Sequence, residues 1–257
     1  MKNIITIFIF SLIVTTTIKA QSGANEILYQ KGLKAKQEYK YQEGLALFQI
    51  LLKSDSSNVD YLAYTSYFLS RVGQLQPLED PKMDYYHKAE YIGKKAVQTD
   101  PNNAEAHYSY ALAIGRVNEF ASNKQKISNA KLLKTELDAC LKLNPEHFGA
   151  WHILGRWHRE IAGLNMVERL AINSFFGGVP PNATYEDAIK CFQNAVKYNP
   201  TYILNYFELA KTYYNRDDKG DKDLAISTLK TALALPNLAP DDPETRKNCE
   251  NLLKKLQ

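Results

Sequence analysis

Residues with catalytic or metal-binding potential are few and poorly placed in this chain. His158 and Glu160 form an H-x-E pattern, but the P-C-x-x-C partner that completes a zinc deaminase site is missing. His152 lies six residues before His158, a spacing that puts the two rings on different sides of one helix. The acidic run of residues 217–223 lacks the alternating ligands and distant glutamate of a calcium loop. We therefore expect packing histidines, a solvated turn and no metal site.

Sequence signatures of enzymes are absent as well. There is no G-x-S-x-G nucleophile elbow, no G-x-x-x-x-G-K phosphate loop and no H-E-x-x-H zinc helix. Cys140, Cys191 and Cys249 are odd in number and widely spaced, which argues against a disulfide framework and indicates buried small side chains. The sequence predicts a protein that is not an enzyme and carries no cofactor.

A helical-repeat pattern, in contrast, recurs along the whole chain. Three prolines are each followed six residues later by a ring and ten residues later by a small side chain. These triplets are Pro101, His107 and Ala111; Pro145, Trp151 and Gly155; and Pro200, Tyr206 and Ala210. Weaker copies keep the spacing near Gly44 and near Ala225. This is close to the W-x2-L-G-x2-Y…A-x3-F…P pattern of tetratricopeptide repeats.

The repeats predict an all-α, tetratricopeptide-like right-handed superhelix of about five helix pairs, ending in a polar capping helix near residues 243–256. The fourth repeat departs from the template, because Gly155 and Pro200 are 45 residues apart where a standard repeat has about 24. The insert, roughly residues 163–183, begins with a helical pattern from Met166 to Ile172. It continues with Phe175, Phe176 and a Gly-Pro-rich loop that cannot be a regular helix.

The repeat pattern also predicts which side chains face the concave groove. They lie one, five and eight residues after the anchor of each repeat, which is the residue at the tryptophan position of the pattern. They are Tyr29, Leu33 and Lys36; Ala63, Tyr67 and Ser70; Tyr108, Leu112 and Gly115; His152, Arg156 and Arg159; and Phe207, Lys211 and Tyr214. The predicted groove is aromatic at one end and basic at the other. Arg156, Arg159 and Lys211 could bind a carboxylate or phosphate, or pair with acids such as Glu160, Glu168 and Glu208.

The N-terminus has the features of a cleaved secretory signal peptide over residues 1–20, followed by the helical-repeat domain over residues 21–257. Lys2 precedes an apolar, Thr-rich run that ends near Ala20. The alternative is a membrane anchor, but the run is about 15 residues against the roughly 20 needed to span a bilayer. We therefore expect an exported protein, periplasmic or secreted, with no stable membrane span after cleavage. The formal net charge of +4 does not indicate nucleic acid as a partner.

The enlarged fourth repeat and its flanks contain three characteristic segments: Leu154-Gly155-Arg156-Trp157-His158, Phe175-Phe176-Gly177 with Pro180-Pro181, and Tyr185-Glu186-Asp187-Ala188. In these segments the chain resembles the regulator of microtubule dynamics family. The resemblance implies an all-helical superhelix with a binding role. Some eukaryotic members lie at mitochondrial or endoplasmic reticulum membranes and are linked to microtubules, tethering or phospholipid binding. An exported chain does not meet tubulin, so that role does not transfer.

Two functions follow from these patterns. In the first, the groove of a cell-envelope scaffold binds a protein or peptide partner through Tyr29, Tyr67, Tyr108, His152, Arg156, Arg159, Lys211 and Tyr214. In the second, the fourth repeat covers an apolar cavity for a lipid or other amphipathic ligand. There Met166, Ile172, Phe175 and Phe176 form a lid, and Arg156 or Arg159 meets an anionic head group.

Overall fold

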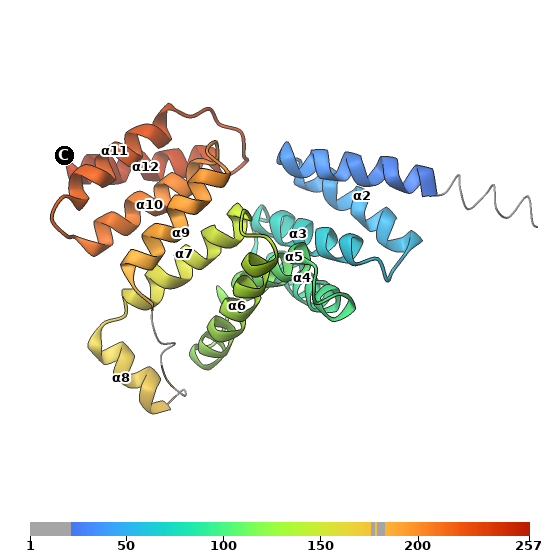
Figure 1. Cartoon of the computed structure of the whole chain (residues 1–257), viewed down its shortest axis with the longest axis horizontal. Helices are drawn as coiled ribbons and strands as arrows, with labels where there is room; N and C mark the ends of the chain where they lie inside the picture. Colours follow the sequence, from blue (N-terminus) through green and yellow to red (C-terminus); the bar gives the residue numbers. More distant parts are fainter. Residues whose placement is uncertain (1–21, 176–177, 179–182) are drawn as a thin grey trace, which may run out of the picture.

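The computed structural model describes residues 22–175, 178 and 183–257, and every regular element in these ranges is a helix (Figure 1). The first helix covers residues 22–37. It is followed by α2 (Tyr41–Ser54), α3 (Val59–Gln74), α4 (Glu79–Thr99), α5 (Ala104–Asn118), α6 (Asn123–Leu143), α7 (Phe148–Ala162), α8 (Met166–Phe175), α9 (Tyr185–Tyr198), α10 (Ile203–Arg216), α11 (Asp221–Ala234) and α12 (Asp242–Leu256).

Consecutive helices pack into the pairs that the repeats predict. α3 packs on α4, α5 on α6 and α10 on α11, while contacts such as α4 with α5 join one pair to the next (Figure 1). In the fourth pair α7 packs directly on α9, so α8 is an addition to the repeat and not one of its two helices. α12 packs on α10 and α11 at the end of the array. The predicted tetratricopeptide-like fold is confirmed.

The spacing between proline and ring has a direct structural cause. Nε1 of Trp151 donates a hydrogen bond to the Pro145 carbonyl at 2.7 Å, and the Tyr206 hydroxyl donates one to the Pro200 carbonyl at 2.9 Å. Nε2 of His107 lies 2.9 Å from the Pro101 carbonyl. Each ring therefore ties the first helix of a repeat to the turn that precedes it.

Short polar side chains set the helix ends around these turns. Asn58 and Asn103 accept hydrogen bonds from backbone N–H groups at the starts of α3 and α5. At the start of α9, the Thr184 hydroxyl accepts from the Asp187 N–H at 3.1 Å. At the start of α6, Gln125 accepts from the Ser122 N–H at 3.1 Å as part of a capping box.

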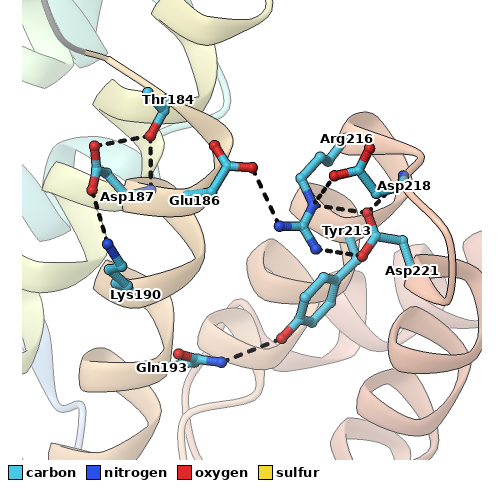
Figure 2. Close-up of polar contacts among 9 residues, drawn as sticks. All are labelled: Thr184, Glu186, Asp187, Lys190, Gln193, Tyr213, Arg216, Asp218 and Asp221. Atoms are coloured by element: carbon cyan, nitrogen blue, oxygen red, sulfur yellow. Dashed lines mark hydrogen bonds and ion pairs between the residues drawn. The ribbon is translucent and has the colours of Figure 1, made fainter.

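The C-terminal repeats are joined by one arginine at the end of α10. Nη2 and Nε of Arg216 donate to the two carboxylate oxygens of Asp221 at 2.6 and 2.9 Å, and Nη1 reaches Glu186 of α9 at 3.4 Å (Figure 2). Asp221 is buried, and hydrogen bonding to Arg216 lowers its pKa. Arg216 therefore connects α9, α10 and α11, and the acidic run predicted to be a solvated turn is partly buried in this ion pair.

The two ends of the array meet through a group that we call the closure cluster, made of Tyr39, Tyr41, Arg71, Tyr202 and Asp241. The Tyr39 and Tyr202 rings stack with their centroids 6.1 Å apart. Arg71 of α3 donates to the Tyr41 hydroxyl and, at 3.4 Å, to the Tyr202 hydroxyl, and lies 3.9 Å from Asp241. Residues far apart in sequence thus bridge the N-terminal helices and the C-terminal helices that face them in Figure 1.

Close helix crossings generate a prediction about two glycines. A Cβ atom on Gly93 of α4 would lie 2.9 Å from the backbone Cα of Tyr110, whereas one on Gly115 of α5 would meet nothing nearer than the Leu133 side chain at 3.4 Å. We expect Gly93→Ala to lower the free energy of unfolding by about 1–2 kcal/mol through overpacking. Gly115→Ala, the matched control, should raise it by about 0.5–1 kcal/mol through helix propensity. Urea denaturation measures both, and equal effects would contradict the crossing geometry.

Candidate functional site

A pocket of about 350 Å³ opens on the concave side of the array. Its walls come from the first helices of the second to fifth pairs, α3, α5, α7 and α10, with a contribution from α6. Rings of Tyr39, Tyr67, Tyr108, Phe148 and Tyr202 line it. Apolar side chains form another part of the wall: Leu112, Ala130, Leu133, Ile153, Trp157 and Ile161. The pocket therefore combines aromatic and aliphatic surface with a few charged groups.

Some of the residues predicted to face the groove line this pocket. Tyr67, Tyr108, His152 and Arg156 do so, as do Leu112 and Gly115. In each of the second, third and fourth repeats, the residue five positions after the anchor lines the pocket. The periodicity of the repeats thus brings side chains from three separate helices to one site.

The prediction that Arg159 faces the groove is wrong. Its side chain is only 2% exposed, and Nη1 pairs with the Glu208 carboxylate and donates to the Glu208 carbonyl at 3.3 Å. Burial opposes ionisation of Glu208, but Arg159 lowers the pKa of that carboxyl nevertheless. A buried charge needs such a partner to offset its desolvation. Arg159 thus joins α7 to α10, as the pairing alternative proposed.

Eight other predicted groove positions also lie outside the pocket lining, among them the predicted partner-binding residues Tyr29, Lys211 and Tyr214. The Tyr29 hydroxyl donates to Asp60 at 3.3 Å, and its ring packs edge-on against Phe48. Tyr214 lies under the ammonium group of Lys255, 4.7 Å from its ring centroid. Lys211 is partly exposed on α10. At both ends of the array, the positions that the repeat pattern assigns to the groove therefore lie outside the pocket.

The predicted lid does not cover this pocket within the described residues. The helical pattern from Met166 to Ile172 does form α8, but no described residue of α8 lines the pocket. Met166 and Val167 are 84% and 76% exposed. Phe176 and the side chain of Phe175 lie outside the described residues. The apolar face of α8 is therefore separate from the pocket.

Sequence reasoning missed a row of charged side chains nine residues after the anchors. Arg71, Arg116 and Glu160 occupy this position in the second, third and fourth repeats, and all three line the pocket. The signal was available, because a residue four positions after a groove residue lies on the same helix face. The row follows Tyr67, Leu112 and Arg156 at that interval.

The side-chain ammonium group of Lys36 lies among the rings at the aromatic end of the groove. Nζ of Lys36 lies 4.8 Å from the Tyr64 and Tyr67 centroids, within cation–π range. It also pairs with Glu105 at 2.5 Å. Burial opposes the ionisation of Glu105, but Lys36 and His147 lower its pKa to about 2. The positive charge of Lys36 is thus neutralised within the protein.

His152 is the histidine that lines the pocket, and it is neutral. Burial lowers its pKa to about 4. Its Nδ1 lies 2.8 Å from Oδ1 of Asn205, whose Nδ2 donates to the Ala195 carbonyl at 3.1 Å. Since Asn205 Oδ1 is an acceptor, Nδ1 carries the proton in this arrangement. His152 therefore contributes a ring and a hydrogen bond to the wall, and no charge at neutral pH.

The remaining reactive groups do not converge on a reaction centre in the described residues. The three cysteines are buried free thiols, and burial raises the pKa of each to about 12. His158 is also buried, and its pKa is lowered by burial. No group of three or more His, Cys, Asp or Glu side chains that could hold a metal ion occurs in the described ranges.

Paired helices curved around a lined groove define a tetratricopeptide-type helical-repeat protein. A tetratricopeptide protein of the thermophile Thermus thermophilus has a similar structure, with a TM-score of 0.61 and 16% identity over 90% of this chain and 99% of that chain. The sequence profile of "Regulator of microtubule dynamics protein 1-3" matches residues 27–257. The chain belongs to the regulator of microtubule dynamics family, and the predicted resemblance is confirmed.

Curated relatives agree with this assignment. Regulator of microtubule dynamics protein 1 of Mus musculus is 28% identical over 92% of this chain and 76% of that protein. Protein 1 of Caenorhabditis elegans is 32% identical over 63% of this chain and 70% of that protein. Human protein 2 is 26% identical over 82% of this chain, which spans about half (51%) of its length.

None of the described helices combines the length and apolar character needed to cross a membrane.

The neutral state of His152 leads to a prediction about pH. An unfolded histidine takes up a proton as pH falls through 6.5, whereas His152 in the folded protein stays neutral down to about 4. Between these pH values protonation favours the unfolded chain, so the free energy of unfolding falls as the pH is lowered. We expect His152→Gln to reduce that fall by roughly 3 kcal/mol, measured by urea denaturation between pH 7 and 4. His87→Gln, at an exposed position on α4, should leave the pH profile as in the parent protein.

Proposed function

We propose that this protein is a non-enzymatic binding scaffold whose concave groove holds a segment of a protein partner. The observation that carries the proposal is the pocket lined by side chains from five helices, with rings on several of them. Tyrosine and phenylalanine offer large, rigid contact area at low cost in side-chain entropy. Curved helical-repeat surfaces are generally used to bind extended or helical peptides.

The chemistry of the pocket favours binding over catalysis. Its carboxylates Glu119 and Glu208 are engaged by Arg116 and Arg159, its third carboxylate Glu160 lies 3.4 Å from Arg159, and His152 is hydrogen-bonded to Asn205. Groups that are held in this way shape and orient a surface. They do not present a nucleophile beside a general base.

We further propose that the protein acts outside the cytosol, either in the periplasm or as a secreted protein. Lys2 and the apolar run over residues 4–18 support this proposal. N-terminal sequencing of the mature protein from its native host should give a start near Gln21. A start at Met1 would contradict cleavage and would leave either the membrane anchor or a cytosolic protein with cytosolic partners.

An amphipathic small molecule is the second candidate for the groove. The aliphatic wall formed by Leu112, Leu133, Ile153 and Ile161 favours it, because apolar surface is typical of small-ligand pockets. Native mass spectrometry of the purified protein separates the two candidates. A co-purifying lipid that a groove substitution removes supports the small ligand, and a ligand-free protein favours the peptide.

Site-specific crosslinking tests the peptide proposal. Phe148 is partly buried and lines the pocket, so we expect the photoreactive analogue benzoylphenylalanine at this position to crosslink a protein partner in the native host. The same analogue in place of Tyr91, 74% exposed on α4 and outside the pocket, is the matched control. Mass spectrometry of the adducts reads out the result. Identical adducts from both positions, or none from Phe148, would overturn the proposed groove.

A further inference from the structure

The charged groups that line the pocket are paired, with one exception. Glu119 is bound by Arg116 at 2.9 Å, and Glu208 by the buried Arg159. Arg71 is held by the closure cluster, and Arg116 also donates to Gln74 at 2.6 Å. Among the described residues, Arg156 has no hydrogen bond or ion pair with any other side chain. Arg156 helps to lower the pKa of Glu208, but it is the cation of the lining that no described carboxylate holds in an ion pair.

Arg156 is well placed to reach a ligand. It is exposed on the pocket-facing side of α7, one turn after His152 and Ile153, which also line the pocket. Since His152 is neutral, the guanidinium does not share its site with a second free cation from that turn. Glu160, one turn later, is 65% exposed and lies 3.4 Å from Arg159. Arg156 thus projects a free planar donor group beside apolar wall.

The surrounding acids limit what Arg156 can bind. A group with two negative charges, such as a phosphate, would carry more charge than the one free guanidinium can neutralise, and it would also face Glu160, whose partner Arg159 is already bound to Glu208. A single carboxylate matches the one free guanidinium, which can hold it through two parallel hydrogen bonds. A cationic group would find Glu119 and Glu208 already paired, and the one remaining carboxylate of the lining, Glu160, is 65% exposed to solvent. The charges therefore favour a ligand with one acidic group.

We propose that the groove selects peptides in which an apolar side chain enters the pocket and a neighbouring Asp or Glu carboxylate binds Arg156. The apolar side chain would lie against Ile153 and Trp157, whose Nε1 is held by the Ala130 carbonyl at 2.8 Å. This inference rests on the proposed peptide-binding function, and it names the class of segment recognised. Arg156 acts as a specificity-determining residue, while the rings provide general affinity.

The test uses fluorescent degenerate peptide pools that share a central Leu or Phe and differ two residues away, where each pool carries Glu, Gln or Lys. We expect the Glu pool to bind the mature protein about fivefold more tightly than the Gln pool, as for a partly exposed ion pair in a good geometry. Arg156→Gln should abolish this difference without weakening the Gln pool. Arg156→Glu should shift the preference to the Lys pool. Fluorescence anisotropy measures each affinity.

Lys211→Gln is the matched control, because it removes a cation on α10 that does not line the pocket. It should retain the preference for Glu. Equal binding of the Glu and Gln pools to the parent protein would overturn the acidic selectivity and leave the peptide groove in place. Binding of no pool would overturn both proposals. If oleate displaced the Glu pool and bound in an Arg156-dependent manner, the carboxylate would belong to a small amphipathic acid, and the peptide assignment would fail.

Discussion

The third, fourth and fifth repeats depend on a shared hydrogen bond, from the ring of the anchor residue to the carbonyl of the proline six residues earlier. His107, Trp151 and Tyr206 all make it, although their rings differ in size and chemistry. Each bond fixes where the first helix of a repeat leaves the turn, and thereby how it crosses the previous pair. Because every repeat buries its apolar face only against its neighbours, an error at one turn would be passed to all later helices.

Most of the fold could be predicted from sequence because it is set by such local rules. Pro, ring and small residue recur at fixed intervals, and Asp55, Asp100, Asn144 and Asn199 close the corresponding turns by accepting a backbone N–H two residues later. The closure cluster could not be predicted in this way. Arg71 and Tyr202 are separated by 131 positions, and their contact depends on the accumulated curvature of the intervening repeats.

The candidate site was only partly predictable, and the errors have a geometric cause. Positions five residues after an anchor line the pocket in three repeats, since they lie at the centre of the concave face. The template places the last groove position at eight, where Arg159 turns into the helix interface to meet Glu208. In an α-helix, the residues eight and nine positions after the anchor lie on opposite sides of the stripe of side chains that is centred on the residue five positions after it. Which of them faces solvent depends on the rotation of each helix against its partner, which repeat spacing does not specify.

Closure of the array changes what the groove can do. Tyr39 and Tyr202 bridge the two arms beside the pocket, so its walls are set before a ligand arrives, and little ordering cost falls on binding. The buried pair of Arg159 with Glu208 and the partly buried closure cluster connect helices of the scaffold, whereas Arg156 is exposed and makes no hydrogen bond or ion pair with another described side chain. In the proposed binding mode, selectivity would therefore depend on an exposed side chain that lies outside these connections. This separation of scaffold from specificity lets related helical-repeat proteins share a fold while binding different partners.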